Sequence, residues 1–390
     1  MADIINPARF VVFGDGEVGY RITRYSREMP HLKQVGYVET EPSILRDVAN
    51  ELRVPLYAAN RDSYDKLHKA GNKPVGTLDD LSDVEFDVAI DATEPQVYFL
   101  DKVPNFRLDV PIIGQGSLTE GFDISVSSLV NLRLVPGRKR IRKVSCNTTA
   151  ASRVISKLQE TYGLGTNADG ENYEISLYRR TANFGLKGLV DNVSFGTGPK
   201  TQHHAHDIDL VFLDLSKSDG GDESTRGKSL AYQGSHTRGH VQHIQIYLNS
   251  RPKEGHELED IYSLLEQSPR MRLLSGVDDI AKVINYFLRK GRFMGDFPEN
   301  VIIKESIQYN PRSNSVELTQ LVDNVSIVIP ENLDIMLMLN GNSKSPGEII
   351  KKVDQNLDDR LLPGFLNPNA KYMGPDDFEN SSKSFVQTQI

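Results

Sequence analysis

The sequence predicts an α/β protein whose N-terminal half forms a doubly wound, mostly parallel β-sheet. Three observations lead to this prediction. Short apolar runs alternate with amphipathic stretches through that half of the chain, as they do in βαβ units. The first apolar run ends in a glycine-rich turn. The length of 390 residues suits two or three domains, each large enough to bury a core.

The first predicted unit consists of an apolar run, a glycine turn, an amphipathic stretch and a second apolar run, at 9–13, Gly14-x-Gly16-x-x-Gly19, 20–29 and 35–38. In such a turn the first glycine allows the sharp bend, the second lets a pyrophosphate approach the backbone, and the third lets the helix pack on the strand. Glu39 follows Gly19 by 20 residues, the spacing of an acidic residue that binds a ribose 2′-hydroxyl. The turn therefore predicts a dinucleotide site in a Rossmann-like domain; the alternative is an ordinary βα turn with a solvated Glu39.

Further short apolar runs at 55–58, 86–90 and 111–113 predict more strands of the same sheet. The last two are followed by Thr93 and Gly116. Ligands of doubly wound sheets bind at the carboxyl ends of the strands. We therefore expect Thr93 and Gly116 near the cofactor, with simple turn residues as the alternative.

Cys146 is the only cysteine of the chain. Apolar residues at helical spacing follow it, so the sequence predicts a helix from about Thr148, capped by Asn147 or a threonine. A helix N-terminus lowers the pKa of a thiol because its dipole stabilises the thiolate. Cys146 is therefore a candidate nucleophile. The alternative is a buried structural cysteine, which the polar residues around it disfavour.

Cationic side chains gather downstream of the cysteine, in the pair Arg179-Arg180 and in two histidine clusters at 203–206 and 236–243. The histidines suggest zinc ligands as one reading, but no further cysteine assists and the arginines would repel a cation. The second reading is an anion site with a general base, suited to a phosphorylated aldehyde. We expect no metal.

Composition excludes several classes of protein. The formal net charge of −8 gives no reason to expect nucleic-acid binding, and the basic run at 138–143 is short enough to be a solvated loop. No apolar run approaches the roughly 18 residues that span a bilayer, and the N-terminus lacks the pattern of a signal peptide. A single cysteine cannot form an internal disulfide. We expect a cytoplasmic protein without nucleic-acid or membrane partners.

These motifs together resemble a known family. Ser145-Cys146-Asn147-Thr148-Thr149, the glycine turn, Arg179-Arg180, His203-His204 and the segment Asp323-Asn324-Val325-Ser326-Ile327-Val328-Ile329-Pro330-Glu331-Asn332 look like archaeal-type (type II) phosphorylating glyceraldehyde-3-phosphate dehydrogenase. The resemblance extends from about Arg9 to about Asp354, and the motifs occur in the family's order.

The resemblance implies a role for each matching residue. Cys146 is the nucleophile and His240 the base. Substrate contacts fall on Ser145, Cys146 and Asn147, and on His203, His204 and Arg179 near phosphate. The cofactor contacts are Glu17, Val18, Gly116, Arg180 and Asn324, in addition to Gly14, Gly16, Gly19, Glu39 and Thr93. The substrates are then a phosphorylated aldehyde and inorganic phosphate, and family members are usually homotetramers.

Several positions depart from the family pattern. Asn324 stands where glutamine is usual, and Glu39 stands where several members carry a lysine that meets the NADP 2′-phosphate. A carboxylate repels that phosphate, so we expect NAD to be preferred, with NADP possible. The residues at 181–184 and at Arg238-Gly239 also differ. A related phospho-aldehyde or semialdehyde dehydrogenase, or a non-catalytic dinucleotide-binding regulatory homologue, therefore remains as an alternative.

The expected architecture has four parts. A Rossmann-like NAD(P)-binding domain covers 1–145. A catalytic α+β domain with a mixed or antiparallel sheet covers 146–330. A C-terminal helix at 331–355 returns to the nucleotide domain, and 356–390 form an extra tail. The loop 217–229, rich in glycine and serine, is expected to be a flexible insertion.

Overall fold

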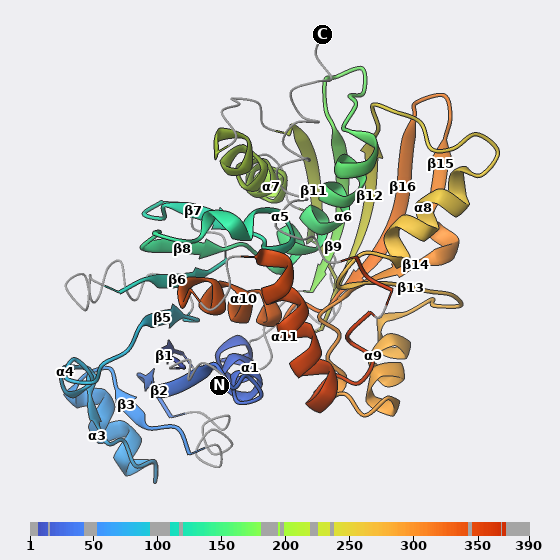
Figure 1. Cartoon of the computed structure of the whole chain (residues 1–390). Coiled ribbons are helices and arrows are strands. Elements are labelled where there is room, and N and C mark those ends of the chain that lie inside the picture. The colour runs from blue at the N-terminus through green and yellow to red at the C-terminus, as the bar shows by residue number, and fades with distance from the viewer. Residues whose placement is uncertain are drawn as a thin grey trace, which may run out of the picture.

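The computed structural model describes residues 7–14, 16–42, 53–93, 110–116, 120–180, 194–195, 199–218, 225–234, 238–341, 345–367 and 369–371. Two eight-stranded sheets organise the molecule and lie side by side (Figure 1). The departures expected at 181–184, His236 and the chain beyond 371 lie outside the described residues.

The first sheet is parallel throughout, with the order β4-β3-β2-β1-β5-β6-β8-β7. Its strands are β1 Ala8–Phe13, β2 Leu32–Glu39, β3 Leu56–Ala58, β4 Gly76–Thr77, β5 Val88–Asp91, β6 Ile112–Gln115, β7 Ile124–Val126 and β8 Arg140–Lys143. Helices α1 Glu17–Ser26, α3 Arg61–Lys69, α4 Leu78–Leu81 and α5 Ser128–Asn131 accompany it, with a 3-10 turn, η2, at Leu132–Leu134. The strand order reverses between β1 and β5, which creates the switch point where dinucleotides bind.

The second sheet is mixed, with the order β10-β11-β9-β12-β16-β14-β13 and β15 paired to β16. Its strands are β9 Tyr173–Arg180, β10 Ser194–Phe195, β11 Gly227–Gly234, β12 His240–Tyr247, β13 Met271–Leu274, β14 Asn300–Ile303, β15 Gln308–Asn310 and β16 Ser315–Val322. The helices α6 Cys146–Tyr162, α7 Pro199–Ser218 and α8 Glu257–Glu266 bury one of its faces. α9 Ile280–Arg289 and the 3-10 turns η3 Phe293–Gly295 and η4 Lys304–Ser306 complete this part. The two sheets confirm the expected fold class.

The C-terminal helices α10 Ile329–Leu339 and α11 Pro346–Arg360 pack on the first sheet. Leu333 and Val353 share one apolar core with Phe10 and Ile22. Figure 1 shows the two helices beside α1, between the sheets. Residues beyond 355 belong to the same core, because Leu357, Leu361, Leu362 and Phe365 are buried in it.

Three local expectations need correction. The helix that carries Cys146 begins at the cysteine itself, and its cap is Ser145, whose hydroxyl accepts from the Thr148 N–H. The supposed loop 217–229 is narrower, since α7 continues to Ser218 and β11 begins at Gly227. The basic run at 138–143 is not a solvated loop, because its second half is β8 with Arg142 and Lys143 fully buried.

Candidate active site

The glycine turn has the geometry that a bound pyrophosphate requires. Gly14 has a φ of +90°, where side chains are disfavoured. A Cβ on Gly19 would lie 1.8 Å from the Gly14 carbonyl oxygen, so helix and strand can approach this closely only with glycine. A Cβ on Gly16, by contrast, would meet nothing within 4 Å. Gly16 thus leaves open space at the start of α1, where no side chain caps the free N–H groups.

The other expected cofactor residues lie around this turn at the carboxyl ends of neighbouring strands. Glu39 is the last residue of β2 and is buried. Thr93 follows β5, and its N–H and hydroxyl both donate to Asp91. Gly116 follows β6 with a φ of +100°, and its N–H donates to the Lys143 carbonyl. The residues present therefore fit a dinucleotide at the switch point of the first sheet.

Two further expected cofactor residues, Glu17 and Val18, occupy the first turn of α1. Glu17 forms an ion pair with Arg21 one turn later, and Val18 packs against the first core. Arg180 ends β9; its side chain lies outside the description.

Cys146 is the first residue of α6 and is partly exposed. Its neighbour Asn147 is buried and held by Gln242 of β12, whose amide donates to both oxygens of Asn147 at 3.0 and 2.9 Å. Residues two apart in a strand share one face, so His240 lies on the same face of β12 as Gln242. The face that carries His240 is therefore turned toward the start of the cysteine helix.

Four of the predicted cationic residues interact with one another: His203, His204, Arg179 and His240. His203 and His204 of α7 have ring centroids 3.8 Å apart. Burial lowers the pKa of His204 well below its usual value, and the positive charges of His203, Arg179 and His240 lower it further. His204 is therefore neutral at pH 7. Among the described residues, neither of its buried ring nitrogens has a hydrogen-bond partner.

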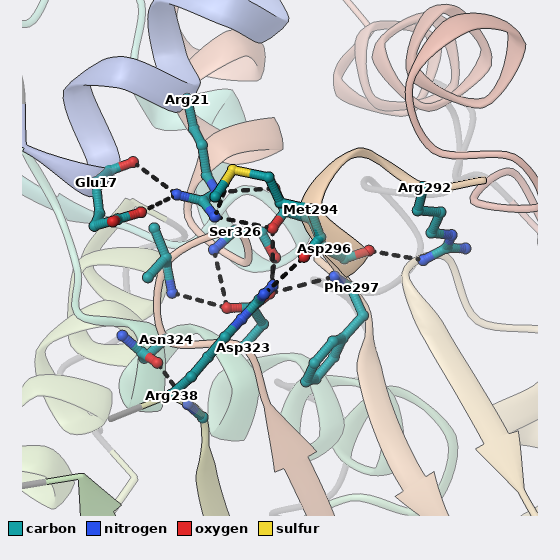
Figure 2. A network of polar contacts seen from close by, with 12 residues as sticks. Glu17, Arg21, Arg238, Arg292, Met294, Asp296, Phe297, Asp323, Asn324 and Ser326 are labelled. Atoms are coloured by element: carbon teal, nitrogen blue, oxygen red, sulfur yellow. Dashed lines mark hydrogen bonds and ion pairs between the residues drawn. The ribbon is translucent and has the colours of Figure 1, made fainter. Parts of the chain in front are cut away.

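Arg238 lies within the cationic cluster predicted at 236–243, but it does not belong to this group. Its guanidinium contacts the carboxylates of Asp296 and Asp323 at 2.8 and 2.7 Å and the Met294 carbonyl at 2.7 Å. Figure 2 shows Arg238 and Arg21 meeting around these carboxylates from opposite sides. Arg238 is therefore a structural cation, engaged by two buried acids.

Asn324 lies within the same network. Its side-chain oxygen accepts a 2.7 Å hydrogen bond from the Gly239 N–H, one residue before His240. Asn324 thus fixes the start of β12, a role that the resemblance did not suggest.

The residue that the sequence most clearly failed to identify is Lys143. Its ammonium is fully buried, three residues before Cys146, and lies 3.4 Å from Glu331 of α10. Strand β8 contains a single apolar residue, Ile141, so its basic residues gave no sign in the sequence that Lys143 would be buried.

The described residues include no group of three or more histidine, cysteine or acidic side chains that could hold a metal ion. Among those same residues, no helix combines the length and the apolar character needed to cross a membrane.

Comparison with known proteins finds glyceraldehyde-3-phosphate dehydrogenases that match most of the chain. No family model matches the chain. The glyceraldehyde-3-phosphate dehydrogenase of Aeropyrum pernix is 30% identical over 355 residues, covering 89% of this chain and 96% of the relative. That of Saccharolobus solfataricus is 30% identical over 329 residues, covering 83% and 90%. That of Haloarcula marismortui is 28% identical over 350 residues, covering 88% and 92%.

The fold, the glycine turn and the cysteine helix agree with these relatives. The chain belongs to the archaeal glyceraldehyde-3-phosphate dehydrogenase family.

Proposed function

We propose that this protein oxidises glyceraldehyde 3-phosphate to 1,3-bisphosphoglycerate, reversibly, with inorganic phosphate and NAD(P). The observation that carries the proposal is the contact between Gln242 and Asn147, which turns the His240 face of β12 toward the start of the cysteine helix. A nucleophile with a nearby base is the arrangement that covalent catalysis on a carbonyl requires.

Cys146 is the proposed nucleophile. Its position in the first turn of α6 stabilises the thiolate, because the N-terminal end of the helix dipole carries partial positive charge. The Sγ atom adds to the aldehyde carbon to give a thiohemiacetal. The backbone N–H groups of the same turn are suited to bind the oxyanion that develops.

His240 is the proposed base. It accepts the hydroxyl proton of the thiohemiacetal, so that oxidation leaves a thioester on Cys146. The bound nicotinamide ring supplies the acceptor for the hydride. Inorganic phosphate then attacks the thioester carbon, and the Cys146 thiolate leaves as the acyl phosphate forms.

Arg179 is the proposed source of fixed positive charge for the phosphate groups, and Arg180 remains a proposed cofactor contact. His203 and His204 complete this pocket. Because His204 is neutral at pH 7, it serves as a hydrogen-bonding group rather than as a charge. Ser145 and Asn147 flank the thiol and are proposed substrate contacts, Asn147 with its oxygens already held by Gln242.

NAD is the proposed preferred cofactor. Glu39 ends β2 and is buried beside the switch point, where its carboxylate suits a ribose 2′-hydroxyl and repels a 2′-phosphate. The glycines Gly14, Gly16 and Gly19, with Glu17, Val18, Thr93, Gly116 and Asn324, complete the proposed cofactor contacts. A Glu39→Lys variant should gain activity with NADP relative to NAD, and Glu39→Gln should gain less. A wild type that already prefers NADP contradicts the assignment.

A homotetramer is the proposed assembly. Tyr178 and Leu230, on the face of the second sheet that α6 and α7 do not cover, are 51% and 41% exposed. Exposed apolar side chains on an open sheet face favour contact with another chain. Light scattering of the purified protein should give the mass of four chains; a monomer contradicts this proposal.

The reaction is tested with purified protein and a panel of aldehydes. NADH formation from glyceraldehyde 3-phosphate should require inorganic phosphate. Faster turnover of erythrose 4-phosphate or aspartate semialdehyde would instead indicate one of the related dehydrogenases. No turnover of any aldehyde, with NAD still bound, would indicate a regulatory homologue.

A further inference from the structure

Lys143 lies directly beneath the turn that carries the nucleophile. It ends β8 and is fully buried. Its ammonium donates to the Val144 carbonyl at 2.6 Å and to the Thr149 hydroxyl at 2.5 Å. Thr149 follows Cys146 by three residues on α6, and side chains three apart lie on the same face of a helix. The ammonium therefore contacts the face of α6 on which Cys146 lies.

Lys143 shares its nearest carboxylate with a second cation. Glu331 of α10 offers one carboxylate oxygen to Lys143 at 3.4 Å, and the other to Arg153 of α6 at 3.0 Å. Burial disfavours the ionised form of Glu331, but Lys143 and Arg153 outweigh it and lower its pKa. Two cations thus share one carboxylate. The neighbouring Arg270 differs from both, because it contacts two other carboxylates.

Arg270 also acts on Glu331. It contacts Asp334 at 2.6 Å and Asp354 at 2.8 Å, and both acids are buried. Three cations and three carboxylates therefore balance formally, but Asp334 and Asp354 lie against Arg270, and among the described residues Glu331 alone lies against Lys143. Lys143 contacts the first turn of α6, whereas Arg153 lies two turns further along the helix.

We propose that Lys143 is a positioning residue that holds Cys146 in its thiolate form by placing an ammonium charge against the first turn of α6. The thiolate gives Lys143 a second nearby negative charge beside the Glu331 carboxylate that it shares with Arg153. This inference rests on the proposed function, which gives the thiolate its purpose, but the thiolate can be detected without that reaction.

The titration of Lys143 agrees with this geometry. Burial lowers the pKa of Lys143 to about 8, with Glu331 opposing the shift, Arg153 adding to it and Cys146 opposing it. The ammonium is therefore charged at neutral pH. Its support for the thiolate falls away as the pH rises through about 8, where an ordinary thiol begins to ionise on its own.

The experiment measures the pH dependence of alkylation by iodoacetamide. Because Cys146 is the only cysteine, the reaction reports a single site. The wild type should show a midpoint below the ordinary value of about 8.5. Lys143→Gln retains a hydrogen-bonding side chain without the charge. It should raise the midpoint by about one pH unit, which makes alkylation about tenfold slower at pH values below both midpoints.

Arg142→Gln is the matched control. Arg142 is the preceding residue of β8, equally buried, and its guanidinium contacts Asp207 at 2.8 Å on the other face of the sheet. It should lose stability without moving the midpoint. Lys143→Met, which removes the charge and keeps an unbranched side chain, should raise the midpoint likewise, and it provides the test if Lys143→Gln fails to fold.

The proposal is overturned by a wild-type midpoint at or above about 8.5, or by a folded Lys143→Gln or Lys143→Met variant with the wild-type midpoint. Alkylation requires no substrate or cofactor. A shifted midpoint without aldehyde oxidation would therefore refute the proposed function alone, and oxidation with an unshifted midpoint would refute only the role of Lys143.

Discussion

Arg21 of α1 and Asp296 form a buried bidentate ion pair, with Nε–Oδ2 and Nη2–Oδ1 distances of 2.8 and 3.1 Å. Asp296 also accepts from the Tyr25 hydroxyl at 2.6 Å and from Arg238 at 2.8 Å. One carboxylate thus joins the helix that follows the glycine turn to the residue two positions before His240 (Figure 2). Helix α1 of the first sheet and the start of β12 in the second sheet are therefore connected at the candidate site itself.

Removal of Arg238 should therefore be costly. Arg238→Leu leaves Asp323 buried without its guanidinium, and loss of one partner from a buried ion pair costs roughly 3 kcal/mol. Urea unfolding should show this loss, accompanied by a lower kcat because the start of β12 is no longer held. Arg61→Leu, which removes an exposed pair with Asp65, is the control and should change little. Equal effects of the two substitutions would contradict the role given to Arg238.

Two substitutions in the glycine turn should separate an effect on NAD binding from an effect on folding. Gly16→Ala adds a methyl group to open space, so the protein should fold normally but bind NAD roughly tenfold more weakly, on the order of 1.4 kcal/mol. Gly19→Ala places the same group 1.8 Å from the Gly14 oxygen and should destabilise the fold by about 3 kcal/mol. Thermal unfolding and NAD titration of both variants check this. Normal NAD affinity in Gly16→Ala would show that the cofactor lies elsewhere.

His204 should make the protein sensitive to acid. Its pKa is well below the ordinary 6.5 in the folded chain, so below pH 6.5 the unfolded chain takes up a proton that the folded chain refuses. Stability is therefore lost as the pH falls, by about 1.4 kcal/mol for each pH unit below 6.5 from this one group. Urea unfolding at pH 7, 6 and 5 should show a shallower loss for His204→Gln than for the wild type. Parallel profiles would mean that His204 is not the residue responsible.

His240 and His243 distinguish the base from its neighbours on β12. His240→Asn should reduce kcat by about 10²- to 10⁴-fold, the usual contribution of a general base. His243 is 47% exposed and contacts Thr319, so His243→Asn should keep near-normal turnover. Steady-state kinetics of the two variants decide the assignment. If His243→Asn alone lost turnover, the assignment of His240 as the base would be wrong.

Sequence reasoning succeeds here where the chemistry is local. The glycine turn, the strand ending at Glu39 and the helix after Ser145 each depend on residues that are adjacent in the chain, and all are present. Arg238 and Lys143 were misread because their partners, Asp296, Asp323 and Glu331, lie far along the chain. A basic residue looks solvated until the fold provides a buried carboxylate.

The cap of the cysteine helix shows a further limit of prediction from the sequence. Ser145, Asn147 and Thr148 are all plausible caps by residue type. The choice of Ser145 depends on where the chain leaves β8, and Asn147 is instead drawn to Gln242 of β12. Residue type identifies the region, whereas tertiary contacts assign the roles within it.

Phosphate-dependent NADH formation by a Cys146→Ser variant tests the central claim most directly. The variant replaces only the sulfur, in a turn already capped by Ser145. The account predicts a folded protein that binds NAD as the wild type does and forms no NADH from glyceraldehyde 3-phosphate above background. Activity close to that of the wild type would contradict the assignment of Cys146 as the nucleophile.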